Sequence, residues 1–168
     1  VDVRPSEGIP QTEFPVITEP GLVNDAAAAV VFSRLRAEVE RLGVQEHVTL
    51  VGHVDEAEKY RELAAAGVHL LPSLKEGWGL SVIEAAQVGV PSVAYTSAGG
   101  VRDSILDGVT GLLADDEAHF VELVRQLLAD PVLREELGVK ARARTAEFTW
   151  EATTRAVAAA LVPHHTCC

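Results

Sequence analysis

Methionine is absent from this sequence of 168 residues, and cysteine is limited to the adjacent pair Cys167 and Cys168. A natural reading frame normally begins with methionine, so a chain that begins with Val1 and contains none favours processed, trimmed or excised material. Adjacent cysteines at a chain end rarely crosslink a fold, which argues against a secreted disulfide scaffold. We therefore expect a reducing, cytoplasmic setting.

Long apolar runs and basic residues are also scarce. The sequence contains no run of about 18 apolar residues, the length that a membrane-spanning helix needs, and no secretory signal can be drawn at its N-terminus. Lys and Arg total 14 against 25 Asp and Glu, which gives a formal net charge of −11. This balance argues against nonspecific nucleic-acid binding, which depends on neutralising phosphates with cations. An anionic ligand must therefore be held by local groups against an unfavourable overall field.

The chain divides into three segments by composition. Residues 1–25 are irregular, because regularly spaced prolines leave no room for a long helix, although Phe14–Ile17 suits a short edge strand. Residues 26–162 are long enough for one domain with a single core. Residues 163–168 form a tail, and a frayed terminus favours tail residues over a soft-metal site for its four candidate ligands: His164, His165, Cys167 and Cys168.

Within residues 26–162 the pattern alternates between strands and helices. Strands are predicted at 48–51, 68–71, 92–95 and 111–113, and helices at 26–42, 56–65, 80–88, 101–106, 117–128, 131–146 and 150–161. This alternation predicts an α/β fold, a single Rossmann-like domain with a doubly wound parallel sheet and helices on both faces. Ligands of such sheets bind beyond the carboxyl ends of the strands. We expect three glycine-containing loops to open on that edge: Gly52–Val54, Ser73–Gly79 and Thr96–Gly100.

The loop before the helix at 80–88 is the most informative part of the sequence. Glu76 and Glu84 are eight positions apart and flank this bend. Gly77 and Gly79 let the backbone approach a ligand with no Cβ in the way. The first turn of the helix points unpaired N–H groups into the bend, which favours an anion. Carboxylates can accept hydrogen bonds from the hydroxyls of a ligand, and backbone amides can donate them to its phosphates. The combination suggests a nucleotide sugar.

The two glutamates also have purely structural explanations. Glu76 can be a solvated glutamate beside Lys75, although the flanking glycines favour a ligand contact. Glu84 can close a capping box with Ser81, in which the glutamate accepts a hydrogen bond from the N-cap amide. We favour a ligand contact for Glu84, because the helix already includes Leu80.

Other residues of the three loops are more ambiguous. Trp78 has a large ring that is expected to pack against the preceding strand. Gly99 and Gly100 precede a helix, and a plain turn explains them as well as a ligand contact does. His53 and Val54 follow a strand directly, where a lone histidine is weak evidence of a site.

Several segments, in this order and spacing, resemble the C-terminal, donor-binding half of retaining glycosyltransferases with two Rossmann-like domains (GT-B fold, family 4-like, glycosyl transferases group 1). The resemblance covers about residues 30 to 160. Its centre is the Glu-x7-Glu motif from Glu76 to Glu84. The other segments that carry it are Val48–Val54, Val90–Ala94, Gly99-Gly100, Asp107–Leu112 and Phe148–Glu151.

The resemblance implies a role for each residue of the site. Glu76, the catalytic residue, hydrogen-bonds the hydroxyls of the donor sugar, and Glu84 binds the ribose. The remaining donor-binding residues act mainly through backbone groups: Gly77, Trp78, Gly79 and Leu80 at the sugar or phosphates, His53 and Val54 near the base, and Gly99 and Gly100 near the donor. The resemblance implies no metal and no cofactor, with a nucleotide diphosphate sugar as substrate.

The resemblance also implies a second domain. Relatives carry the acceptor site on an N-terminal domain of similar size, for which this sequence has no room, and any membrane contact would come through that half. Without it we expect the chain to be inactive or nearly so.

The sequence departs from the family pattern near its start. Relatives have an arginine and a lysine there that clamp the diphosphate, whereas Arg4 is the only Lys or Arg before Arg34. Such cations lower the barrier by several kcal/mol, and each ~1.36 kcal/mol is tenfold in rate. This departure favours the alternative of a non-catalytic nucleotide-sugar binding module or degenerate fragment. A generic doubly wound signalling or flavin domain is a further alternative, but the acidic pocket or phosphate loop that it predicts after the first strand is not evident.

Overall fold

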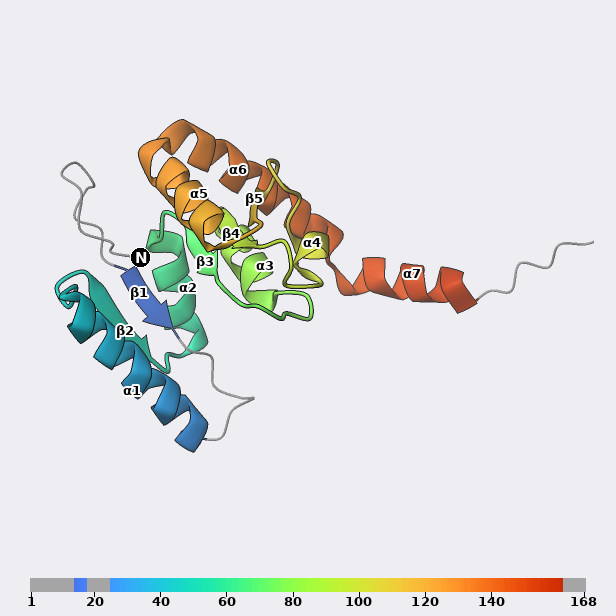
Figure 1. Cartoon of the computed structure of the whole chain (residues 1–168). Helices are drawn as coiled ribbons and strands as arrows, with labels where there is room; N and C mark the ends of the chain where they lie inside the picture. The colour runs from blue at the N-terminus through green and yellow to red at the C-terminus, as the bar shows by residue number, and fades with distance from the viewer. Residues whose placement is uncertain (1–13, 18–24, 162–168) are drawn as a thin grey trace, which may run out of the picture. The chain divides into compact units, whose positions relative to one another are not determined.

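The computed structural model describes residues 14–17 and 25–161, with side chains over 30–161. The chain divides into two compact units, Val1–Glu62 and Leu63–Cys168 (Figure 1). The segments expected to be irregular at the N-terminus and to form the tail lie mostly outside these residues, as do the four candidate metal ligands of the tail.

The first unit contains a parallel pair of strands. Strand β1 (Phe14–Ile17) pairs with β2 (Val48–Gly52), with a register shift near Ile17, and α1 (Asp25–Leu42) lies between them in sequence. The short strand expected at Phe14–Ile17 is therefore present, as β1. Gly43 follows α1 with a φ of 67°, the left-handed conformation that ends helices.

Helix α2 (Glu56–Ala65) runs from the end of the first unit into the start of the second. Asp55 caps it, because its Oδ1 accepts a hydrogen bond from the N–H of Glu58 at 2.8 Å. This side chain satisfies an amide that the helix leaves without a partner.

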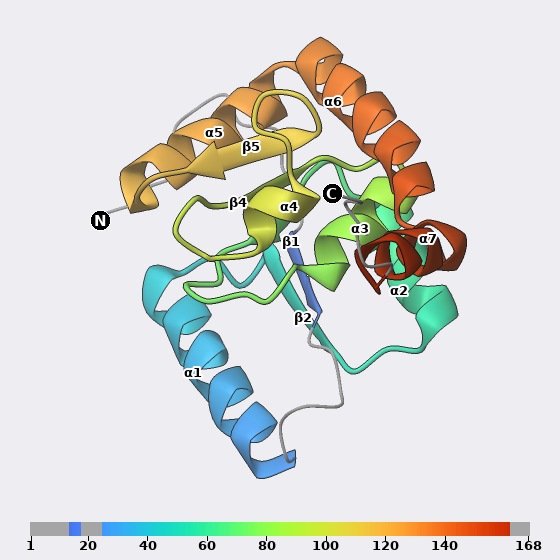
Figure 2. The same cartoon turned by 90° about the vertical axis from the view of Figure 1, so that its right-hand side faces the viewer.

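The second unit is built on a three-stranded parallel sheet in the order β3-β4-β5, and Figure 2 shows β4 beside β5. Its strands are β3 (His69–Leu71), β4 (Ser92–Tyr95) and β5 (Gly111–Ala114), and Ser92 lies opposite His69 on one side and Gly111 on the other. The first three residues of the central strand are almost fully buried, as expected for a strand that is covered on both faces.

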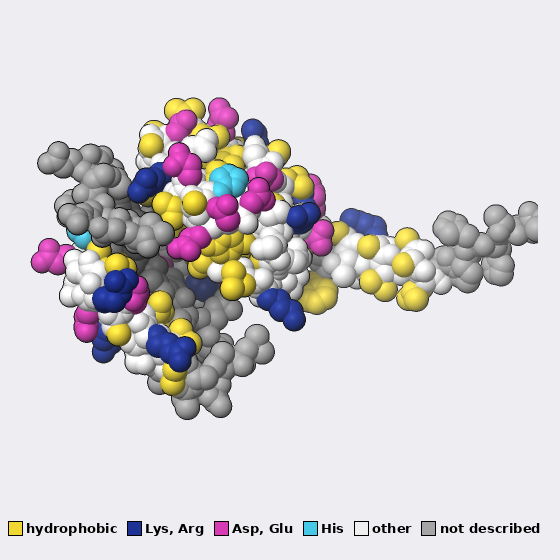
Figure 3. All heavy atoms as spheres, viewed as in Figure 1, with side chains coloured by type: hydrophobic (Ala, Val, Ile, Leu, Met, Phe, Trp, Pro, Cys, Tyr) yellow, Lys and Arg dark blue, Asp and Glu magenta, His cyan; other side chains and the backbone are white. Residues whose placement is uncertain are grey.

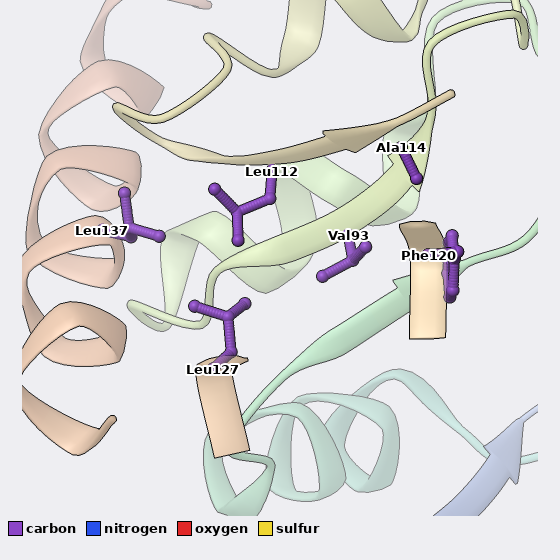
Figure 4. Close-up of a cluster of buried hydrophobic side chains, with 6 residues drawn as sticks. All are labelled: Val93, Leu112, Ala114, Phe120, Leu127 and Leu137. Carbon is purple, nitrogen blue, oxygen red and sulfur yellow. The ribbon is translucent and has the colours of Figure 1, made fainter. Parts of the chain in front are cut away.

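Helices cover both faces of this sheet. One core cluster joins Val93 to α5 and α6, and its members are Val93, Leu112, Ala114, Phe120, Leu127 and Leu137 (Figure 4). The next residue, Ala94, belongs to a second cluster with Val82, Ala98, Val101 and Ile105, which come from α3, α4 and their flanking loops. Adjacent strand residues point to opposite faces, so the two clusters are the two sides of one sheet.

The helices of the second unit are α3 (Leu80–Gln87), α4 (Val101–Ser104), α5 (Glu117–Ala129), α6 (Pro131–Arg144) and α7 (Trp150–Leu161), with a 3-10 turn at Thr145–Glu147. The predicted break before α6 is confirmed. Pro131 is its first residue, and Asp130 Oδ1 accepts hydrogen bonds from the N–H groups of Val132 and Leu133.

The predicted α/β fold with a parallel sheet is confirmed, with differences in detail. The helix expected at 101–106 ends at Ser104, because Ile105 is extended. The helix expected at 131–146 ends at Arg144, where the 3-10 turn begins. The hydrogen-bonded pairs described here form two sheets, one in each unit, rather than one continuous ladder.

Candidate functional site

The start of α3 determines what the Glu76 loop can offer a ligand. Gly79 is the N-cap of α3, with a φ of 78° and a ψ of 67°. A side chain at this position would be strained, and its Cβ would lie 3.2 Å from Val82 Cγ2. Among the described side chains none caps this helix end. The first amides of α3, at Leu80 and Ser81, are therefore available to an anion.

The capping-box explanation of Glu84 is wrong. A capping box needs the glutamate three residues after the N-cap, and the N-cap is Gly79, so Glu84 is in the second turn of α3. Glu84 lies one helical turn after Leu80, on the same face, and its Cα–Cβ bond leans toward the start of the helix. Glu84 is half-buried, whereas Leu80 is 66% exposed.

The loops that follow β3 and β4 are joined through their backbones. The N–H of Glu76 donates to Ala98 O at 2.7 Å, and the N–H of Gly100 donates to Glu76 O at 3.3 Å. Glu76 and Gly99 form an isolated parallel bridge. The two strands thus continue as one paired structure beyond the end of the sheet, as expected for the carboxyl edge at which ligands bind.

Steric constraints explain the glycine pair after β4. A Cβ on Gly100 would lie 1.7 Å from Gly77 O, and a Cβ on Gly99 would lie 3.0 Å from Glu76 O. Gly99 also has a φ of 86°. The pair is therefore more than a plain turn before α4, because it lets the two loops touch.

The side chain of Trp78 makes a contact that the sequence did not indicate. Its ring meets the ring of Phe148 edge-on, with centroids 4.8 Å apart and planes at 83°. The expected packing partner was the preceding strand, whereas the aromatic partner comes from the segment after α6. Arg144, on α6, places its guanidinium 5.2 Å from the centre of the Phe148 ring.

The edge around the loop is open. A pocket of about 610 Å³ adjoins it, and its lining includes Trp78 and Leu80 together with Phe148 and Trp150 of the C-terminal segment. Gly77 is exposed and Glu76 is half-buried. The loop is therefore accessible to solvent at Gly77 and on the side of Trp78 and Leu80.

His53 and Val54 belong to the first unit and follow β2 directly. His53 is exposed and Val54 is half-buried. Gly52 before them has a φ of 79°, so the chain turns sharply at the end of the strand. Their contact with a nucleotide base stays a prediction.

One half-buried histidine, His69, belongs to the sheet and not to the site. His69, at the start of β3, places Nδ1 2.9 Å from Ser92 Oγ of the neighbouring strand. Burial lowers the pKa of His69 to about 4, because a charged imidazolium would lose its hydration. This residue is therefore neutral at physiological pH.

The described residues contain neither a cluster suited to a metal ion nor a membrane-spanning helix. Among the described side chains, no group of three or more His, Cys, Asp or Glu is placed to hold a metal ion. Within the same part of the chain, no helix has the length and apolarity needed to cross a membrane.

Comparison with known proteins gives a consistent result. Residues 30–144 match the family model described as glycosyl transferases group 1. A D-inositol 3-phosphate glycosyltransferase of Frankia alni is 36% identical over 118 residues, which are 69% of this chain and 29% of the relative. This chain therefore spans less than a third of that relative's length.

Solved structures share the fold. A sucrose-phosphate synthase from Thermosynechococcus elongatus superimposes with a TM-score of 0.71 at 30% identity, over 87% of this chain and 38% of the other. Anabaena Alr3699/HepE, solved with UDP and glucose, gives a TM-score of 0.75 at 20% identity, over 90% of this chain and 41% of the other.

Proposed function

Because this chain belongs to the glycosyl transferases group 1 family, we propose that it is the donor-binding half of a retaining, metal-independent glycosyltransferase. In this proposal the loop from Glu76 to Leu80 binds a nucleotide diphosphate sugar. The observation that carries the proposal is the junction of the loops after β3 and β4. There the backbone of Glu76 is hydrogen-bonded to Ala98 and Gly100. This junction stands beside a helix start that no described side chain caps.

Each group of the site has a distinct task in this proposal. Glu76 orients the donor sugar through its hydroxyls, and the half-buried Glu84 accepts hydrogen bonds from the ribose. The amides of Leu80 and Ser81 face the diphosphate, where they stabilise negative charge that develops as it leaves. HepE, of the same fold, has been solved with UDP and glucose, which supports a donor of this class.

The proposed reaction is the retaining transfer that the family resemblance implies. The bond from the anomeric carbon to the diphosphate oxygen breaks, and a bond to the acceptor oxygen forms on the same face of the sugar. The acceptor proton passes to a phosphate oxygen of the departing nucleotide. No side chain of this chain acts as the nucleophile, and the acceptor binds to a second domain that is also part of the proposal.

Calorimetric titration tests the donor site. The full chain is titrated with UDP, GDP and ADP and with their glucose conjugates, and we expect one base to bind. Glu84→Gln removes a charged acceptor and is expected to weaken that binding about tenfold or more. Glu122→Gln, an exposed glutamate of α5, is the matched control and should leave affinity unchanged.

Two results would contradict the donor site. The first is the absence of binding for every nucleotide, and the second is equal affinity in the Glu84→Gln and Glu122→Gln variants. The second result would favour a generic doubly wound domain.

A non-catalytic binding module is the second candidate. It is favoured by the sequence before Arg34, in which Arg4 is the only Lys or Arg where relatives have a diphosphate clamp. Both candidates predict binding, so an assay of sugar transfer after addition of an N-terminal acceptor domain separates them. Transfer supports the enzyme half, and binding without transfer supports the module.

A further inference from the structure

The Glu76 loop is held on one side by the glycine pair and on the other by an aromatic contact. On the first side, Gly100 donates to Glu76 O and sits against Gly77. On the second side, the ring of Trp78 meets the edge of Phe148, with centroids 4.8 Å apart. The loop is therefore constrained through both its backbone and its side chain.

Arg144 connects these two sides. Its Nη2 donates to Asp103 O on α4 at 2.7 Å, and its guanidinium lies 5.2 Å from the centre of the Phe148 ring. Helix α4 begins directly after Gly100, and it lies beside the C-terminal end of α6 (Figure 1). The contacts thus close a ring: from the loop to Gly100, along α4 to Asp103, through Arg144 to Phe148, and through Trp78 back to the loop.

The side chains of Arg144, Phe148 and Trp78, which close this ring, lie outside the packed core. Of the described residues in the two core clusters, neither set includes Arg144, Phe148 or Trp78. Trp78 and Phe148 are half-buried and line the open pocket. Loss of either contact is therefore expected to change the order of the loop more than the stability of the fold.

The placement of Arg144 has a cost. Its Nε is buried and finds no hydrogen-bond partner among the described residues. A buried N–H without a partner is unfavourable, so an apolar side chain of similar length would fit this position with less penalty. What only the guanidinium supplies is the combination of a hydrogen bond to Asp103 O and a cation over the Phe148 ring.

We propose that Arg144 and Phe148 are positioning residues that hold the Glu76 loop, through Trp78 and α4, in the conformation that receives a nucleotide diphosphate sugar. This inference rests on the proposed function for its ligand, but the claim that the ring orders the loop stands independently. Neither residue touches the substrate in this proposal. They act by keeping Glu76 and the amides before α3 in place.

The two tryptophans of the chain, Trp78 and Trp150, allow a direct test. In a Trp150→Phe parent, Trp78 becomes the only tryptophan and reports on the loop. Phe148→Leu and Arg144→Met are expected to make Trp78 roughly twofold more accessible to acrylamide quenching, with an unchanged melting temperature. Arg142→Met, an exposed arginine on the same helix, is the charge control, and Phe148→Tyr should restore parent behaviour because it keeps the ring.

Titration with UDP and GDP supplies the second readout. The nucleotide that the parent binds should bind about five- to tenfold more weakly to Phe148→Leu and Arg144→Met, because a loosened loop must be ordered first. Equal quenching of Trp78 in the parent and in both variants would overturn the proposal. If Phe148→Leu fails to fold, Trp78 quenching in Arg144→Met and Phe148→Tyr still tests the proposal. A parent that binds neither nucleotide refutes the proposed function, while the quenching result alone then decides whether the ring holds the loop.

Discussion

Helices α5 and α7 have almost the same length and a similar amphipathic pattern, yet they differ in what they bury. Over its 13 residues, α5 buries Phe120 and Leu127 against the sheet. Over the 12 residues of α7 no side chain is buried within the described part of the chain, and Leu161 is 75% exposed. Figure 3 shows apolar side chains along the surface of α7. The pattern predicts a helix, but burial depends on a neighbour that the pattern does not specify.

The difference in burial between α5 and α7 is tested most strongly by replacing a leucine of each helix with alanine. Leu127→Ala deletes a side chain that is 0% exposed and is expected to cost about 2–5 kcal/mol of unfolding free energy, from lost burial and a cavity. Leu161→Ala, on α7, should change it by less than about 0.5 kcal/mol. Chemical denaturation measures both. Equal losses would mean that α7 is packed as firmly as α5.

The second test concerns the loops that meet at the edge of the sheet. Gly100→Ala would place a Cβ 1.7 Å from Gly77 O, so the two loops must separate, at an expected cost of about 1–3 kcal/mol. Gly77→Ala is the matched control, because none of the described atoms lies within 4 Å of its Cβ position. If both variants melt like the parent, the loops are not in contact.

The third test uses acid. His69 has a pKa of about 4 in the folded chain, against an ordinary value of 6.5. The contribution of His69 to the free energy of unfolding is therefore largest when its imidazole is neutral. As pH falls below 6.5 the unfolded chain takes up the proton first, and stability decreases until the pH reaches about 4. From pH 7 to 5.5 the loss should be about 1 kcal/mol, from the two pKa values and linkage.

A variant isolates this contribution. His69→Gln removes the titrating group, so its stability should vary less with pH than that of the parent over the same interval. Parallel pH profiles for the two chains would show that His69 does not titrate abnormally.

The smallest expected effect lies on α7. Trp150 is 84% exposed, and Trp150→Ala should change the unfolding free energy by no more than about 0.5 kcal/mol. A larger loss, measured by denaturation, would mean that Trp150 is covered in solution.

Most of the elements near the site could be predicted from the sequence. The alternation of apolar strands and helices predicted the strand at 92–95 and the helix that begins at Leu80. These features are local, because glycines, prolines and periodic apolar residues act on their own segment. The loop with Glu76 was found for the same reason.

What the sequence did not indicate depends on contacts between distant segments. Arg144 was not singled out, because nothing in its neighbourhood shows that it reaches Asp103, 41 positions away. The reason for Gly100 was missed as well, since it is the backbone of Gly77 that leaves no room for a Cβ. From the sequence, the preceding strand is the expected packing partner of Trp78, whereas its ring contacts Phe148.

The capping-box alternative for Glu84 failed for a different reason. The capping box and the ligand contact are both compatible with the sequence around Glu84. The backbone angles of Gly79 show where the helix begins, and they exclude the capping box. A helix start one or two residues later would have placed Glu84 near an end amide.

Amide hydrogen exchange with and without bound nucleotide reports on the donor site itself. With saturating UDP or GDP, whichever binds, we expect slower exchange in the segment from Gly77 to Ser81 and at Gly100, with little change in α5. Protection confined to other segments, with the Glu76 loop exchanging at its ligand-free rate, would contradict a donor site at this edge of the sheet.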